Sequence, residues 1–249
     1  MNIDPDTGIG GAQNRFPETH QSAIVQARST DSIVRQRAFD TILTSYWKPV
    51  YKYVRLKWQA GNEDAKDLTQ GFFANAFEKN HFANYDAHKA SFQTFLRTCL
   101  DGFVAHERKA GKRLKRGGDR EHFQLDFVSA EDEFELHRAA EDLTPEDYFH
   151  REWVRGMFTL AVEALRRRCE ETSRTVHFRL FERYDLDEQT TSYSSLGREF
   201  GLDSTTVNNY LASVRRDFRR IVLEKLREIT ATEDEFRNEA RSLLGVDVK

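Results

Sequence analysis

The stretch Ser192–Arg220 reads SYSSLGREFGLDSTTVNNYLASVRRDFRR and has the pattern of two helices joined by a glycine turn. Ser192 can cap a first short helix, Gly201 allows a tight turn, and Asp203 can cap a second helix. Apolar residues recur on the second helix at spacings of four, three and four positions: Val207, Leu211, Val214 and Phe218. The stretch therefore predicts a helical pair whose second member buries one face.

The opposite face of this second helix is polar. Hydroxyl and amide side chains stand at its beginning: Ser204, Thr205, Asn208 and Asn209. Arginines stand near its end: Arg215, Arg216, Arg219 and Arg220. Such a helix suits a DNA major groove, where amides and hydroxyls read base edges and arginines hold phosphates. A plain helical hairpin has the same pattern, so the stretch alone leaves DNA binding and simple packing as equal alternatives.

The composition is that of a soluble intracellular protein with one large or two small domains. The two cysteines, Cys99 and Cys169, lie far apart without metal-ligand spacing, which favours a reduced compartment. No apolar run approaches the length of a membrane span, and the beginning of the chain lacks the pattern of a signal peptide. We therefore expect a cytoplasmic protein without membrane insertion.

Charge is distributed unevenly along the chain. The formal net charge of −3 is unusual for a nucleic-acid binder, because phosphate contacts require a basic surface. Acidic residues concentrate around 119–146, and a basic tract beginning at Arg108 directly precedes them. We expect an acidic linker that carries most of the negative charge and separates two basic surfaces.

Helical periodicity without strand-like alternation predicts an all-α fold of two small domains. The predicted order is a disordered N-terminus at 1–21, a helical domain at 22–118, the acidic linker at 119–146, a helical domain with the helix-turn-helix at 147–230, and a C-terminal extension at 231–249. The extension has two interpretations, a regulatory segment and a packed helix.

The sequence offers no arrangement suited to catalysis or metal binding. His106, His122 and His137 lack zinc-ligand spacing, and no phosphate-binding glycine loop or nucleophile elbow occurs. Carboxylates abound in the linker, but a flexible tether cannot hold a general acid and a general base in register. We expect no enzymatic activity, no metal and no cofactor.

The order of elements resembles a known family. The motifs DLTQGFFANAF at Asp67–Phe77 and FQTFLRTC at Phe92–Cys99, followed by the basic tract, resemble region two of the sigma factors of bacterial RNA polymerase. The helix-turn-helix resembles region four. With only a linker between them, the layout is similar to the extracytoplasmic-function (ECF) group. The resemblance covers about 35–118 and 148–228, and it implies core RNA polymerase and promoter DNA as partners, with an anti-sigma protein as a further candidate.

The resemblance also implies three functional surfaces. The residues that would dock on the clamp coiled coil of the largest polymerase subunit are Asp67, Leu68, Gln70 and Phe73. Those that would capture the melted promoter strand and its phosphates are Phe92, Phe95, Arg97, Arg108, Lys109, Lys112 and Arg113. Those that would read the distal element as duplex are Ser204, Thr205, Asn208, Asn209, Arg215, Arg216 and Arg219.

Several residues depart from the family pattern. Gly71 stands where the docking helix usually carries an acidic residue, and Gly102 stands where asparagine is common. Gly197 replaces the usual alanine in the first helix of the helix-turn-helix, which lowers helix propensity. These departures indicate a divergent branch and leave the promoter sequence unassigned.

Two other classes of protein fit the residues. The first is a conventional dimeric helix-turn-helix regulator that does not dock on core polymerase. The second is a helical adaptor that binds only protein. Charge reversal at Asp67 together with Gln70→Ala separates a sigma factor from a regulator. Replacement of Arg215 and Arg216 separates a DNA-binding protein from an adaptor.

Overall fold

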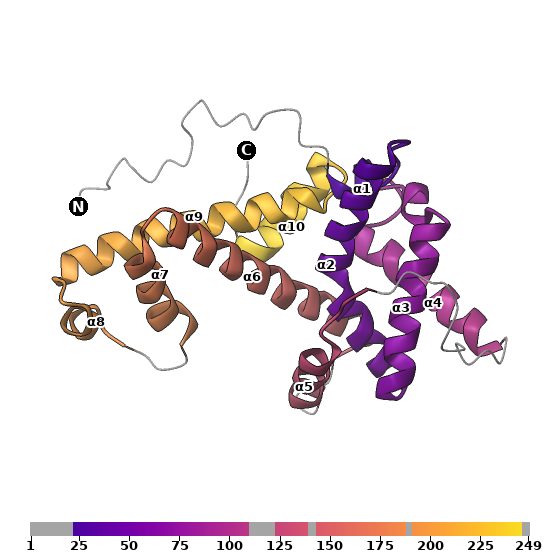
Figure 1. Ribbon diagram of the computed structural model, residues 1–249, viewed down its shortest axis with the longest axis horizontal. Helices are drawn as coiled ribbons and strands as arrows, with labels where there is room; N and C mark the ends of the chain where they lie inside the picture. Colours follow the sequence, from indigo (N-terminus) through magenta and orange to yellow (C-terminus); the bar gives the residue numbers. More distant parts are fainter. Residues whose placement is uncertain (1–21, 110–122, 139–142, 188–190, 246–249) are drawn as a thin grey trace.

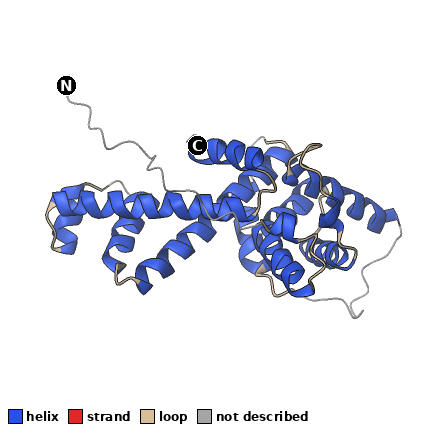
Figure 2. Cartoon of the chain, turned by 90° about the horizontal axis from the view of Figure 1, so that it is seen from above, coloured by secondary structure: helices blue, strands red, loops and turns tan. Residues whose placement is uncertain are grey.

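The computed structural model describes residues 22–109, 123–138, 143–187 and 191–245. Within these ranges all regular secondary structure is helical and no strand occurs, which confirms the predicted all-α class (Figures 1 and 2). The helices are α1 (Ala23–Gln26), α2 (Ser32–Lys57), α3 (Asn62–Glu78), η2 (His81–Asn84), α4 (Phe92–Lys109), α5 (Phe127–Arg138), α6 (Pro145–Glu171), α7 (Thr175–Phe181), η3 (Glu182–Leu186), α8 (Tyr193–Phe200), α9 (Ser204–Glu228) and α10 (Glu233–Leu244). The predicted N-terminal segment 1–21 lies outside the described residues.

The buried side chains form two hydrophobic cores. The first core is built on α1 to α4 and is rich in aromatic residues, including Phe39, Tyr46, Tyr53, Phe72, Phe73, Phe82 and Phe92. The second core lies between α6, α7, α8 and α9, and it includes Leu165, Phe178, Leu180, Leu196, Leu211 and Val214. The helical stripe predicted around Ser192–Arg220 therefore faces the second core.

Helices α6 and α9 contribute to both cores. The first turns of α6 place Phe149 and Trp153 in the first core, and its later turns place Leu165 in the second. Helix α9 begins in the second core and ends with Leu226 in the first. The two long helices lie side by side, where the rings of Phe158 and Phe218 stack at 5.9 Å (Figure 1). The two predicted domains are thus joined by packed helices.

The described part of the acidic segment is packed against α2, which differs from the expected flexible tether. Phe127 lies 5.2 Å from the ring of Tyr51 and 5.5 Å from that of Trp47. Arg55 of α2 pairs with Glu131 at 2.6 Å and with Glu135 at 3.2 Å. Sequence composition missed this contact because the complementary basic residues lie about eighty positions earlier in the chain, on one face of α2.

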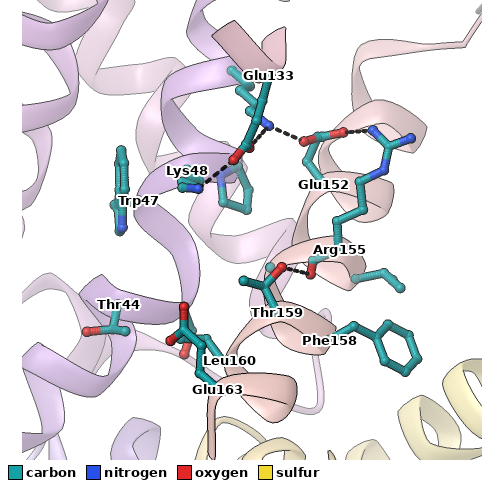
Figure 3. A pocket seen from close by; sticks show the side chains of 15 residues that line it. Thr44, Trp47, Lys48, Glu133, Glu152, Arg155, Phe158, Thr159, Leu160 and Glu163 are labelled. Carbon is teal, nitrogen blue, oxygen red and sulfur yellow. Dashed lines mark hydrogen bonds and ion pairs between the residues drawn. The ribbon is translucent and has the colours of Figure 1, made fainter. Parts of the chain in front are cut away.

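A buried ion-pair cluster joins α2, α5 and α6. Lys52 is 2% exposed and lies 2.5 Å from Glu152 and 2.7 Å from Glu133. Burial alone would raise the pKa of Glu133, but hydrogen bonds from Lys48 and Lys52 lower it to about 2. Glu152 also accepts a hydrogen bond from Arg155 (Figure 3). Because buried charges are costly unless they are paired, this cluster holds the three helices in one arrangement.

The same cluster lines part of a groove between α2 and α6. The groove has a volume of about 550 Å³, and its other lining includes Trp47, Phe158 and Leu160 (Figure 3). The charged side chains of the cluster are paired with one another. We therefore assign it no ligand.

Candidate nucleic-acid and protein interfaces

Helices α8 and α9 form the helical pair predicted from Ser192–Arg220. The hydroxyl of Ser192 accepts a hydrogen bond from the backbone N–H of Ser195, and the carboxylate of Asp203 accepts one from that of Thr206. Gly201 ends α8 with φ +68°, in the left-handed region that glycine favours. Both N-terminal caps and the turn thus follow from local sequence.

Gly197 has a packing role that the sequence pattern did not reveal. A methyl group added at its Cα would lie 2.5 Å from the backbone oxygen of Leu202, and the N–H of Leu202 donates to the carbonyl of Gly197 at 2.8 Å. The turn between α8 and α9 therefore approaches α8 so closely that only glycine fits. The glycine expected simply to weaken the helix is what allows this turn to pack.

We expect Gly197→Ala to destabilise the protein by about 1–3 kcal/mol, because the added methyl group must displace backbone. Gly156→Ala is the matched control, since a methyl group there meets nothing within 4 Å inside α6. The Gly156→Ala variant should be more stable than the unmodified protein by about 0.5–1 kcal/mol, because alanine favours a helix more than glycine does. Urea denaturation of both variants measures the difference, and equal stability of the two would contradict this account.

The polar residues predicted to read duplex DNA begin α9. Ser204, Thr205, Asn208 and Asn209 are all exposed there. Positions separated by four residues share one helical face, so the hydroxyl and amide groups form one patch. Arg216 and Arg219, further along α9, are exposed as well. The patch and its cationic flank are brought together by the helix itself.

Arg215, predicted to join this surface, is held by the neighbouring segment. Its guanidinium makes a bidentate pair with Asp185, at 2.8 Å from Nη2 and 2.9 Å from Nε, and lies 5.1 Å from the ring centroid of Tyr184. The pairing with Asp185 raises the pKa of Arg215 above its usual range. No local sequence pattern indicates this contact, because Asp185 lies thirty positions away in the π-helical segment η3.

The residues predicted to capture a single strand lie at different depths. Phe92 is 1% exposed, and its ring packs against Tyr46 at 5.4 Å and Tyr85 at 5.2 Å. Phe95 is half-buried against Tyr85, and Arg97 lies over the ring of Phe149 from α6. Phe92 belongs to the first core because it lies on the apolar stripe of α4.

The basic tract is described in part. Arg108 and Lys109 are exposed at the end of α4, where Arg108 stacks on Trp58 and donates a hydrogen bond to its carbonyl oxygen. Lys112 and Arg113 lie outside the described residues. The two described cations lie at the opposite end of α4 from Phe92.

The predicted docking residues divide into buried and accessible groups. Leu68 and Phe73 are buried in the first core, with exposures of 9% and 0%. Asp67 and Gln70 are partly exposed on α3. The amide of Gln70 accepts a hydrogen bond from the backbone N–H of Phe123 at 3.1 Å and donates one to its carbonyl at 2.7 Å. The chain that precedes α5 therefore crosses the predicted docking helix.

Among the described residues, no group of three or more His, Cys, Asp or Glu side chains could hold a metal ion. None of the described helices is both long and apolar enough to cross a membrane.

The chain thus combines a first helical core that carries a DLTQGFFANAF helix with a second that presents an amide-rich helix start beside exposed arginines. This combination defines an all-helical protein with two hydrophobic cores. The family model for ECF sigma factors matches residues 22–222, and the chain belongs to that family. No curated protein and no solved structure matches it significantly.

Membership defines the general role. The protein is a sigma factor that directs transcription initiation, a transcription factor rather than an enzyme. Its partners in this role are core RNA polymerase and promoter DNA, and it acts with the polymerase in the cytoplasm. The match ends within α9, so α10 lies beyond the part of the chain that the family defines.

Proposed function

We propose that the chain reads duplex promoter DNA with α9 and captures the melted promoter strand with the exposed side of α4. The observation that carries this proposal is the patch of Ser204, Thr205, Asn208 and Asn209 at the start of α9. Amide and hydroxyl groups at the beginning of a helix are suited to base edges in the major groove. Arg216 and Arg219 hold phosphates beside them.

In the proposed strand capture, the exposed side chains of α4 contact the nucleic acid and the buried ones support them. The half-buried ring of Phe95 offers a stacking surface, which contributes about 1–3 kcal/mol per base. Phe92 packs beneath it and fixes the position of Tyr85 and Phe95. Arg108 and Lys109 attract the backbone phosphates.

In the proposed polymerase docking, Asp67 and Gln70 form the contact surface, and Leu68 and Phe73 anchor α3 in the first core. Docking through Gln70 requires its amide to leave Phe123. The carboxylate of Asp67 remains partly exposed, which makes it the residue through which docking is tested most directly.

We expect Asp67→Lys to weaken binding to core RNA polymerase by about tenfold or more, because charge reversal places a repulsive group in the interface. Co-elution on a sizing column with core polymerase measures this. Asp64→Lys is the matched control, since Asp64 is exposed in the first turn of the same helix. Equal co-elution of the two variants would contradict the docking assignment. Failure of the unmodified chain to co-elute, with duplex binding intact, would favour the dimeric regulator.

A further inference from the structure

Helix α10 folds back onto the part of the chain that the family defines. Thr232 caps it, and Phe236 and Ala240 are buried in the first core, at 1% and 0% exposure. Arg227, near the end of α9, lies 3.9 Å from the ring centroid of Phe236. The C-terminal extension is thus anchored against the same core as α4 by apolar contacts.

One carboxylate of α10 contacts the first turn of α4. An oxygen of Glu235 accepts hydrogen bonds from the backbone N–H of Phe92 at 3.0 Å and from the hydroxyl of Tyr85 at 3.1 Å. Its other oxygen accepts from the N–H of Ala231 at 2.8 Å. The first N–H groups of a helix have no partner inside the helix and favour negative charge. Glu235 supplies that charge from 143 positions further along the chain.

A second acid in α10 makes this contact less favourable at neutral pH. Glu239 lies one turn after Glu235, and its burial, together with the charge of Glu235, raises its pKa to about 7. The other titratable group that interacts with both acids is the buried Tyr46 of α2, which cannot neutralise them. Two neighbouring carboxylates therefore face the buried aromatic cluster beneath α4. Of the two, only Glu235 accepts hydrogen bonds from the described residues.

We propose that α10 is an autoinhibitory cover of the strand-capture surface, and that the melted promoter strand displaces it. This inference rests on the capture role proposed above for α4. The contacts of Glu235 occupy the start of α4, directly beside Phe95. The carboxylate of Glu235 at the start of α4 repels the phosphates of an incoming strand. A strand that contacts the backbone at the start of α4 must displace Glu235.

The direct test is a variant that releases α10 from the first core. The full chain with Glu235→Ala and Phe236→Ala loses the hydrogen-bonded carboxylate and the buried ring that hold α10 in place. We expect it to bind a short labelled single-stranded DNA of randomised sequence about tenfold more tightly, by fluorescence anisotropy. The matched control is Asp234→Ala with Asn238→Ala, since both residues are exposed on the same helix. The control should bind as the unmodified chain does.

A second variant shifts the equilibrium between docked and undocked α10 toward the docked state. Because the pKa of Glu239 is raised in the docked state, docking is strongest below about pH 4.5 and weakens as the pH rises to about 7. Glu239→Gln removes this penalty, so at neutral pH it should bind single-stranded DNA more weakly than the unmodified chain. A helix that only stabilises the fold would leave DNA binding unchanged in this variant.

The outcomes separate the two proposals. If core polymerase carrying the unmodified chain binds single-stranded DNA, and the opened variant binds no more tightly, the cover is excluded while strand capture stands. If neither form binds although both co-elute with polymerase, strand capture and the cover fall together. Hydrogen exchange on the unmodified chain tests the cover without a variant that could unfold. Adding DNA should speed exchange in α10, and unchanged protection there would also exclude the cover.

Discussion

Lys52→Met is expected to destabilise the protein by about 3 kcal/mol or more, because it leaves the buried Glu152 with only one of its two cations. Both side chains are 2% exposed, so water cannot replace the lost partner. Arg155 still pairs with Glu152 at 2.5 Å, which places the effect near the lower end of the range for a broken buried pair. Urea denaturation of the purified chain measures the loss.

Two further variants identify the cause of that loss. Lys52→Met combined with Glu152→Leu removes both charges and should recover most of the stability, because apolar side chains of similar size replace the pair. Lys66→Met breaks an exposed pair with Glu63 and should cost less than about 1 kcal/mol. If the double variant were as unstable as the sum of its single changes, the buried pair would not explain the effect.

Asn208→Ala combined with Asn209→Ala should abolish most of the preference for promoter duplex over other DNA, by about tenfold or more. Each well-placed amide contributes about 1–3 kcal/mol of discrimination between bases. Both amides are exposed on the first turns of α9, so their removal should leave the second core intact. The measurement is binding of the holoenzyme to duplexes that the unmodified holoenzyme selects from a randomised pool.

Arg216→Ala is the control for that experiment. It should weaken binding to all duplexes alike and lower the slope of log affinity against log salt by about one, because it removes a phosphate contact. Unchanged selectivity in the Asn208 and Asn209 double variant would show that α9 does not read bases. Loss of selectivity in Arg216→Ala would show that the arginine does more than hold a phosphate.

The part of the site that could be predicted from sequence depends on contacts within a few residues. The caps at Ser192 and Asp203 were predictable because a cap bonds to a backbone group three positions away. The exposed patch on α9 was predictable because helical periodicity separates it from Val207 and Leu211. Helical periodicity also predicted the all-α class.

Other assignments depended on long-range packing. Phe92 was a reasonable stacking residue by pattern, but it is buried because Tyr46 and Tyr85 cover it from other segments. Arg215 lies on the predicted face, and a carboxylate from η3 holds it. Neither contact leaves a signal at spacings of three or four residues.

The C-terminal extension illustrates the same limit. Its cap and its apolar positions predict a helix, and α10 forms where they stand. Its contact with α4 pairs residues 143 positions apart, and only the tertiary structure shows it.

Local sequence alone therefore determined the helices, their caps and the polar face of α9, because those features arise from bonds between near neighbours along the chain. The tertiary structure alone decided which predicted residues remain accessible. It joined the two cores through α6 and α9, packed the described part of the acidic segment on α2, and placed Glu235 of α10 at the start of α4. Burial and charge pairing act through space, so they depend on where distant segments meet.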